Sequence, residues 1–227
     1  MIGYHLCFDL NYFHVLHADF NRDPVWLGLR TLIVSLFLLA VGMSLVLSAQ
    51  RESALHRFAI RQLRIGACAI LVSAASYAMF PSTFIFFGIL HFIFVASLIG
   101  MALLRCRVPG IANAVAGTLA VAVGLQWSAQ VFDSAPWQWV GFMTHKPPTE
   151  DYVPLFPWIG VVLLGMAAGQ LLQKRKAANM RENAAGRMAA PPNPQWRAGA
   201  WMGRHSLIIY MLHQPILLGT LYLLVGR

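Results

Sequence analysis

The chain has 227 residues, of which 58% are hydrophobic and only 11% are charged, whereas soluble domains carry about 25% charged residues. This composition excludes an ordinary soluble domain, and apolar runs long enough for a helix to cross a bilayer indicate a membrane protein. The net charge of +9 does not indicate a nucleic-acid partner, because most basic residues lie in three short stretches between apolar runs. The three cysteines fall in or beside predicted spans and give no disulfide framework.

Seven apolar segments predict an all-α integral membrane protein, a polytopic bundle of about seven transmembrane helices that forms a single domain over residues 1–227. The segments are residues 1–16, 25–48, 65–80, 83–104, 108–126, 153–172 and 205–225. Residues 174–203 form a basic, Ala/Pro-rich connector that we expect to be flexible. The first segment is too short to span a bilayer, so we expect an upstream in-frame extension that encodes a basic residue and several apolar ones.

The distribution of charge predicts how these segments are oriented. The stretches after the second, fourth and sixth segments hold thirteen of the seventeen Lys and Arg residues, and the positive-inside rule places them in the cytoplasm. The N-terminus is then cytoplasmic, and the tryptophan-rich loop between the fifth and sixth segments lies on the opposite side. Tryptophans near that boundary are typical of an aromatic belt.

His5 and Asp9 are candidate catalytic residues in the first segment. They are four residues apart, so they share one face of a helix. A carboxylate beside an imidazole favours a general base, and ionisable groups inside a span are usually functional. The alternative is a polar pair that joins two helices. His17 follows at the predicted outer surface and is a third catalytic candidate, with an ordinary interfacial histidine as its alternative.

Four further polar residues are candidate contacts for the substrate or for an oxyanion. Arg30 lies inside the second segment and either extends outward to water or faces Asp9 or a substrate charge. His91 and His213 lie inside apolar segments, and Asp151 precedes the sixth, where it could simply cap the helix. The histidines have no spacing that requires a metal, and no metal is expected.

Several stretches resemble one family. MIGYHLCFDLNYF, LHADFNRDPVWLG, FFGILHFIFVASL, DYVPLFPWIGVVLLGM and GRHSLIIYMLHQP are similar to bacterial inner-membrane proteins related to the catalytic domain of heparan-alpha-glucosaminide N-acetyltransferase, over residues 1 to about 217. The resemblance implies a transmembrane acyltransferase that moves an acyl group from cytoplasmic acyl-CoA to a sugar across the membrane. It aligns His17 with a histidine implicated in catalysis, and it implies an arginine upstream of Met1. His5 also resembles the histidine of the acyltransferase family 3 pattern.

The resulting hypothesis is a bacterial inner-membrane enzyme that uses acetyl-CoA to acylate a hydroxyl or amine of an envelope glycan. Basic residues on the cytoplasmic side would hold the CoA phosphates, with membrane topology and anionic lipid as their alternative role: Arg61, Arg64, Arg105 and Arg107. The expected partners are membrane lipids, the glycan acceptor and, as an alternative to a monomer, a second copy of the chain in a homodimer. Two rival hypotheses are a proton-coupled small-molecule transporter and a non-catalytic subunit of an envelope-synthesis complex.

Overall fold

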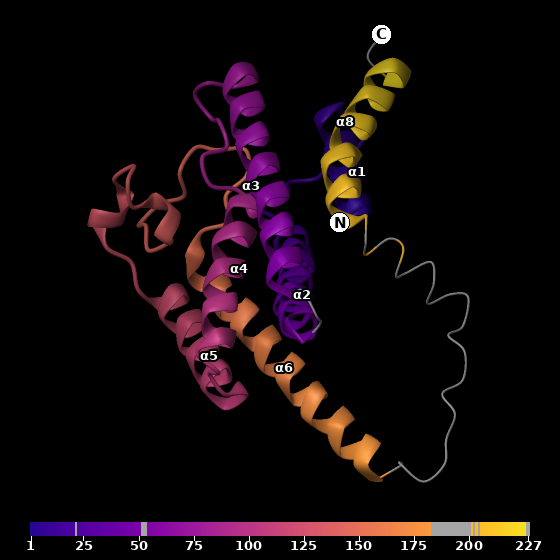
Figure 1. Cartoon of the computed structure of the whole chain (residues 1–227). Coiled ribbons are helices and arrows are strands. Elements are labelled where there is room, and N and C mark those ends of the chain that lie inside the picture. Colours follow the sequence, from indigo (N-terminus) through magenta and orange to yellow (C-terminus); the bar gives the residue numbers. More distant parts are fainter. Residues whose placement is uncertain (21, 51–53, 183–200, 202, 204, 226–227) are drawn as a thin grey trace. The chain divides into compact units, whose positions relative to one another are not determined.

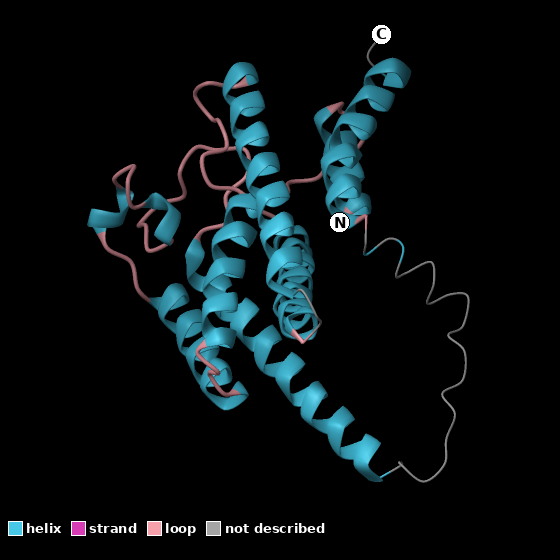
Figure 2. Ribbon diagram, in the orientation of Figure 1, coloured by secondary structure: helices cyan, strands magenta, loops and turns pink. Residues whose placement is uncertain are grey.

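The computed structural model describes residues 1–20, 22–50, 54–182, 201, 203 and 205–225, and every regular element in them is helical (Figures 1 and 2). The elements are α1 (Ile2–Tyr12), α2 (Pro24–Ala49), α3 (Ala54–Met79), α4 (Ile89–Arg105), α5 (Gly110–Gln126), the short 3-10 helices η1 (Gln130–Asp133) and η2 (Gln138–Val140), α6 (Leu155–Glu182) and α8 (Ser206–Val225).

Four of these helices, α2, α3, α6 and α8, are long and apolar enough to cross a membrane, and α4 and α5 are shorter apolar helices. The predicted class, a helical membrane bundle, is confirmed. Helix α1 has 11 residues, so at about 1.5 Å a residue it covers roughly half of a hydrocarbon core about 30 Å thick.

Three helix boundaries differ from the predicted segments. Helix α3 begins at Ala54 rather than near residue 65, because the Arg, Leu and Gln residues of its first half favour a helix as strongly as the apolar half does. Helix α4 begins at Ile89 rather than near residue 83, since residues from Pro81 onward form turns. Helix α6 continues to Glu182, so residues 174–182 of the predicted connector are helical. The rest of the connector, apart from Trp201 and Gly203, lies outside the described residues.

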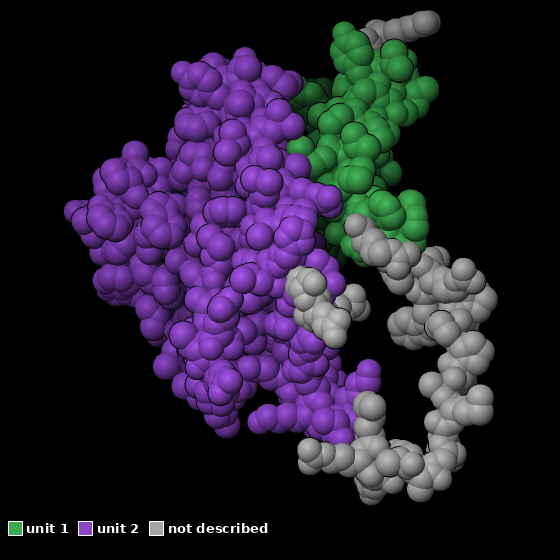
Figure 3. Space-filling view, viewed as in Figure 1, with its two compact units in different colours: residues 1–34, 185–227 green, residues 35–184 purple. Residues whose placement is uncertain are grey.

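The chain divides into two compact units, one of residues 1–34 and 185–227 and the other of residues 35–184, and each is described by itself (Figure 3). In the larger unit, α6 packs against α2 on one side and α5 on another. A methyl group added at Gly42 of α2 would lie 2.1 Å from the carbonyl oxygen of Val162, and one added at Gly160 would lie 2.4 Å from that of Gly117 in α5. Small residues therefore let these backbones touch, as in other membrane helix pairs.

The connections of the larger unit meet at two opposite ends. The Thr149 hydroxyl donates to the carbonyl of Phe84 at 2.8 Å, which joins the α3–α4 and α5–α6 connections. At the other end, the Gln170 side chain on α6 donates to the carbonyl of Val108 at 3.0 Å, and Gln173 donates to that of Val46 at 3.0 Å. Alternate connections thus lie at opposite ends, as repeated crossing of a membrane requires. The predicted cytoplasmic orientation stays a prediction.

Candidate functional site

The smaller unit brings together polar residues from its first and last helices. Helices α1 and α8 lie side by side (Figure 1). The side-chain nitrogen of Gln214 on α8 donates to Asp9 Oδ1 on α1 at 2.9 Å. The rings of His5 and His213 lie edge to face with their centres 5.0 Å apart. Asp9 is only 1% exposed and His213 is also buried, so a carboxylate and two imidazoles lie together where α1 meets α8.

One hydrogen bond determines the tautomer of His213. Its Nδ1 lies within hydrogen-bond distance of the carbonyl oxygen of Tyr210, one turn earlier in α8. A carbonyl only accepts, so Nδ1 carries the proton and the neutral ring presents Nε2 as an acceptor. The Nε2 atom is buried and has no hydrogen-bond partner among the described residues. A neutral imidazole held in this way has the form of a general base.

Two more acceptor atoms at this site also lack partners. Among the described residues, five buried side-chain polar atoms have no hydrogen bond, and three of them are Asp9 Oδ2, His213 Nε2 and Gln214 Oε1. Leaving such an atom unsatisfied costs about 1–3 kcal/mol. All three accept hydrogen bonds when Asp9 is ionised, so the site lacks donors rather than acceptors.

The local sequence of α8 explains how this helix can present polar groups. Pro215 lies inside α8, and its ring nitrogen cannot donate to the carbonyl of Met211. A helix with a free carbonyl beside His213 and Gln214 is suited to lining a polar site rather than facing lipid. Sequence analysis singled out His213 but not Gln214. The signal that would have found Gln214 is an amide next to a proline in an apolar span.

An aromatic cluster holds α1 against the start of α2. Phe20, which is buried, lies 4.3 Å from Trp26 between ring centres, and it also contacts Tyr4 and Phe8 of α1 at 5.7 and 5.4 Å. Such pairs add about 0.5–1.5 kcal/mol each beyond the area they bury. The cluster therefore fixes the helix that carries His5.

His17 and Arg30, in the same unit, do not join the polar site. Both side chains are exposed, and neither makes a hydrogen bond or ion pair within the described part of the chain. In the described residues Asp9 Oδ1 accepts from Gln214, and Arg30 forms no ion pair with Asp9. The catalytic role of His17 and the substrate role of Arg30 stay predictions.

His91, in the larger unit, has both ring nitrogens engaged. Its Nδ1 accepts from the Gly88 backbone N–H at 3.3 Å, so Nε2 carries the proton and donates to the Ser73 hydroxyl at 3.1 Å. The hydroxyl in turn donates to the carbonyl of Ile85 at 2.6 Å. These bonds fasten the first turn of α4 to α3, which is a structural role. The predicted contact with substrate is untested.

Asp151 caps a helix other than the one it precedes. Its Oδ2 accepts from the backbone N–H of Ile89 at 2.8 Å, at the N-terminus of α4 rather than of α6. The carboxylate packs so closely on Gly88 that an added methyl group there would lie 2.3 Å from Oδ2. Burial raises the pKa of Asp151, although this hydrogen bond and Lys146 oppose the change. Its predicted role as a substrate contact stays open.

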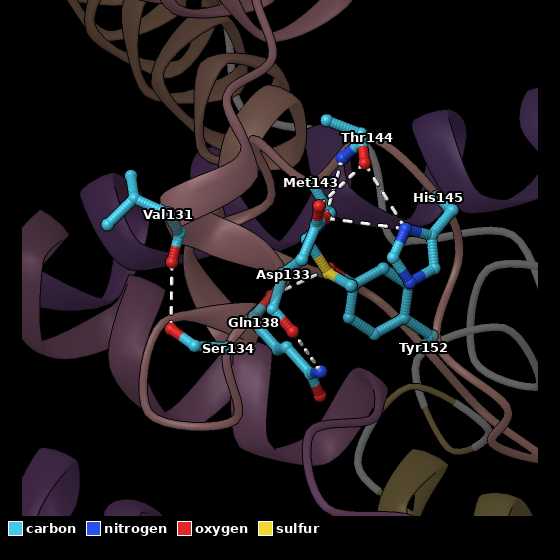
Figure 4. Close-up of polar contacts among 8 residues, drawn as sticks. All are labelled: Val131, Asp133, Ser134, Gln138, Met143, Thr144, His145 and Tyr152. Atoms are coloured by element: carbon cyan, nitrogen blue, oxygen red, sulfur yellow. Dashed lines mark hydrogen bonds and ion pairs between the residues drawn. The ribbon is translucent and has the colours of Figure 1, made fainter.

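The tryptophan-rich loop contains a second carboxylate network, drawn in Figure 4. Asp133 accepts from the Thr144 hydroxyl at 2.6 Å and from the Thr144 backbone N–H at 2.8 Å, and His145 Nδ1 lies 3.6 Å away. These groups lower the pKa of Asp133, the Thr144 hydroxyl most of all. Nearby, the Tyr152 hydroxyl donates to the carbonyl of Gln138 at 2.6 Å, and burial raises the pKa of Tyr152 to about 12. This network orders the loop.

The four arginines proposed for CoA lie in the larger unit and have different surroundings. Arg61 is half-buried on α3, whereas Arg64, Arg105 and Arg107 are exposed. Arg107 lines a cavity at the turn between α4 and α5, and the other three are not among the described residues that line this cavity. A CoA site that uses all four is not assembled by the contacts of the described residues. In the same part of the chain no group of three or more His, Cys, Asp or Glu residues is arranged to hold a metal ion.

The fold and the buried acid–imidazole cluster define a polytopic helical membrane protein with an ionisable site between two of its helices. The family described as heparan-alpha-glucosaminide N-acetyltransferase, catalytic, matches residues 1–215. The chain therefore belongs to this family of membrane acetyltransferases, and the match includes His5, Asp9, His213 and Gln214. Comparisons with curated proteins and with solved structures find no match. The match runs through both compact units, and the prediction of a single domain stays a prediction.

Proposed function

We propose that the protein transfers an acetyl group from acetyl-CoA to a hydroxyl or amine of a glycan at the bacterial inner membrane. The cluster of His5, Asp9, His213 and Gln214 would bind the acceptor. The observation that carries the proposal is the set of three buried acceptor atoms without donors. A hydroxyl or an amine supplies the hydrogen-bond donor that these atoms lack, whereas a thioester or an anion does not. Family membership supplies the reaction class.

The proposed reaction begins with the acceptor O–H or N–H donating to His213 Nε2. The acceptor oxygen or nitrogen attacks the carbonyl carbon of the thioester, and the proton passes to Nε2. The C–O or C–N bond forms, the C–S bond breaks, and the thiolate leaves and takes the proton back from the imidazolium as the free thiol. The charge of Asp9 favours the imidazolium while it exists, because the two groups share a site of low dielectric constant.

His213→Asn tests the role of the imidazole as a base. An asparagine side-chain nitrogen can replace Nδ1 and keep the bond to the Tyr210 carbonyl, but it offers no base at the position of Nε2. The full chain in lipid nanodiscs is incubated with acetyl-CoA and either glucosamine, which offers an amine, or N-acetylglucosamine, which offers only hydroxyls. Mass spectrometry follows both the acetylated sugar and free CoA. We expect kcat to fall by about 10²–10⁴ with an unchanged melting temperature.

The matched control is His56→Asn, because His56 is exposed on α3 outside the cluster. It should keep the wild-type kcat. Equal activity of wild type and His213→Asn would end the assignment of His213 as the base. Absence of transfer in the wild type with every acceptor, despite binding of acetyl-CoA in a calorimetric titration, would point to a different acceptor class.

A proton-coupled transporter is the second candidate, because a buried carboxylate beside two imidazoles also suits a proton relay. It predicts solute uptake into vesicles driven by a pH gradient without consumption of acetyl-CoA. Uptake that is lost in Asp9→Asn, with no acetyl transfer in the wild type, would favour it over the enzyme.

A further inference from the structure

The larger unit contains a cavity whose lining includes none of His5, Asp9, His213 and Gln214. It has a volume of about 440 Å³ and lies where the C-terminal end of α2, the α4–α5 turn and the second half of α6 meet. Its polar lining comes from Gln50, Arg107, Gln170, Gln173 and Lys174, together with the backbone around Gly110. No acidic residue is among the described residues that line it.

Two glutamines of the cavity wall, Gln170 and Gln173, are engaged in hydrogen bonds, whereas its two cations form no ion pair among the described residues. Gln170 accepts from Asn113 at 3.0 Å and donates to the Val108 carbonyl at 3.0 Å, while Gln173 donates to the Val46 carbonyl at 3.0 Å. These bonds hold three helices around the cavity. Neither Arg107 nor Lys174 forms an ion pair with a carboxylate of the described residues. The two cations therefore remain available to a ligand.

The α5 N-terminus adds a third positive element. Pro109 is its N-cap residue and makes no side-chain capping bond. The first-turn N–H groups of α5 have no helical acceptor, and Pro109 and Gly110 line the cavity. A helix N-terminus of this kind favours an anion, and Arg next to it provides the paired donors that match phosphate oxygens. Together with the two cations that line this open cavity, the helix N-terminus favours an anionic ligand.

We propose that this cavity binds a phosphate ester, which Arg107 and Lys174 hold at the N-terminus of α5. Two sources share this chemistry: the headgroup of an anionic phospholipid and a soluble phosphate ester such as CoA. The ends of α2 and α4, at Ala49 and Arg105, place the cavity where a spanning helix leaves the hydrocarbon and headgroups lie. The proposal does not rest on the acetyl-transfer reaction, because binding is measured without turnover.

The backbone conformation of Arg107 suits glycine, so this residue can be replaced to remove its charge without straining the helix end. Its φ is 55°, in the left-handed region that favours glycine. Its N–H bonds the Leu104 carbonyl at 3.0 Å and the N–H of Val108 bonds that of Leu103 at 3.0 Å, the pattern of a Schellman helix end. Glycine is the usual residue at this position, so Arg107→Gly removes the guanidinium and relieves a backbone cost of about 1–2 kcal/mol. The variant should melt no lower than the wild type.

The test measures binding to the full chain in phosphatidylcholine nanodiscs by native mass spectrometry and calorimetry. One arm adds dihexanoyl phosphatidylglycerol with dihexanoyl phosphatidylcholine as its neutral reference, and the other adds free CoA. We expect Arg107→Gly and Lys174→Gln each to weaken binding about tenfold, as loss of a charge-assisted hydrogen bond should. Lys176→Gln is the matched control, because Lys176 is an exposed lysine of α6 that does not line the cavity.

The outcome in each arm decides the proposal. Selective loss of phosphatidylglycerol binding supports the lipid source, selective loss of CoA binding supports the soluble source, and loss of both supports one shared site. Binding of neither compound to the wild type overturns the proposal. Equal weakening by Lys176→Gln also overturns it, since this would show a diffuse surface charge rather than a site.

Discussion

Gly160→Ala tests the packing that positions α6 against α5. The new methyl carbon would lie 2.4 Å from the Gly117 carbonyl oxygen and 2.9 Å from the Val121 backbone nitrogen. These are backbone atoms that cannot rotate away, so the helices must separate by about 1 Å to restore ordinary contact distances. Overpacking of this kind typically costs about 1–3 kcal/mol.

The gain in helix propensity opposes part of this cost. Alanine is favoured over glycine by about 0.8–1.0 kcal/mol inside a helix. Gly28→Ala is the matched control, because Gly28 lies in α2 and an added methyl group there meets nothing within 4 Å. The difference between the two variants therefore isolates the packing cost.

The assay is thermal unfolding of the purified chain in detergent, followed by near-UV circular dichroism and by size-exclusion chromatography after heating. For a chain of this length, each kcal/mol changes the melting temperature by about 2–4 °C. We expect Gly28→Ala to melt at or slightly above the wild type and Gly160→Ala to melt about 2–12 °C below Gly28→Ala. Equal melting temperatures for the two variants would refute direct backbone contact between α5 and α6.

Two further predictions concern titratable groups outside the spans. Because burial raises the pKa of Asp151, its contribution to stability is complete below the unfolded-state pKa and is lost as pH rises through the folded-state pKa. Asp151→Asn should therefore melt no lower than wild type at pH 8, whereas Asp151→Ala, which removes the cap on Ile89, should lose about 0.5–2 kcal/mol. Equal losses in both would show that the charge itself is required. Because hydrogen bonds lower the pKa of Asp133, its contribution is present above the unfolded-state pKa and is lost as pH falls through the folded-state value. Thr144→Val should move the acid transition of the loop, followed by tryptophan fluorescence, to higher pH, and identical titrations would contradict this role.

Much of the architecture follows from one-dimensional properties of the chain. Runs of apolar residues of bilayer length predict helices, because every backbone group must be satisfied in lipid, and helical periodicity places His5 and Asp9 on one face. The resemblance to the acetyltransferase family, confirmed over residues 1–215, is also a property of the sequence. The helix boundaries were less predictable. The charged first half of α3 and residues 174–182 of α6 favour helix by propensity, and hydropathy does not detect this.

The partners of the polar groups were decided only by the tertiary structure. Asp9 pairs with Gln214, 205 residues away, rather than with Arg30, and Asp151 caps α4 rather than the helix it precedes. Hydrogen bonds act over about 3 Å, so their partners depend on which helices pack together and not on spacing along the chain. His5 and Asp9, by contrast, are four residues apart on one helix, so the sequence alone shows them as a polar pair. Their description as half of an acceptor-rich site needed the packing of α8 against α1.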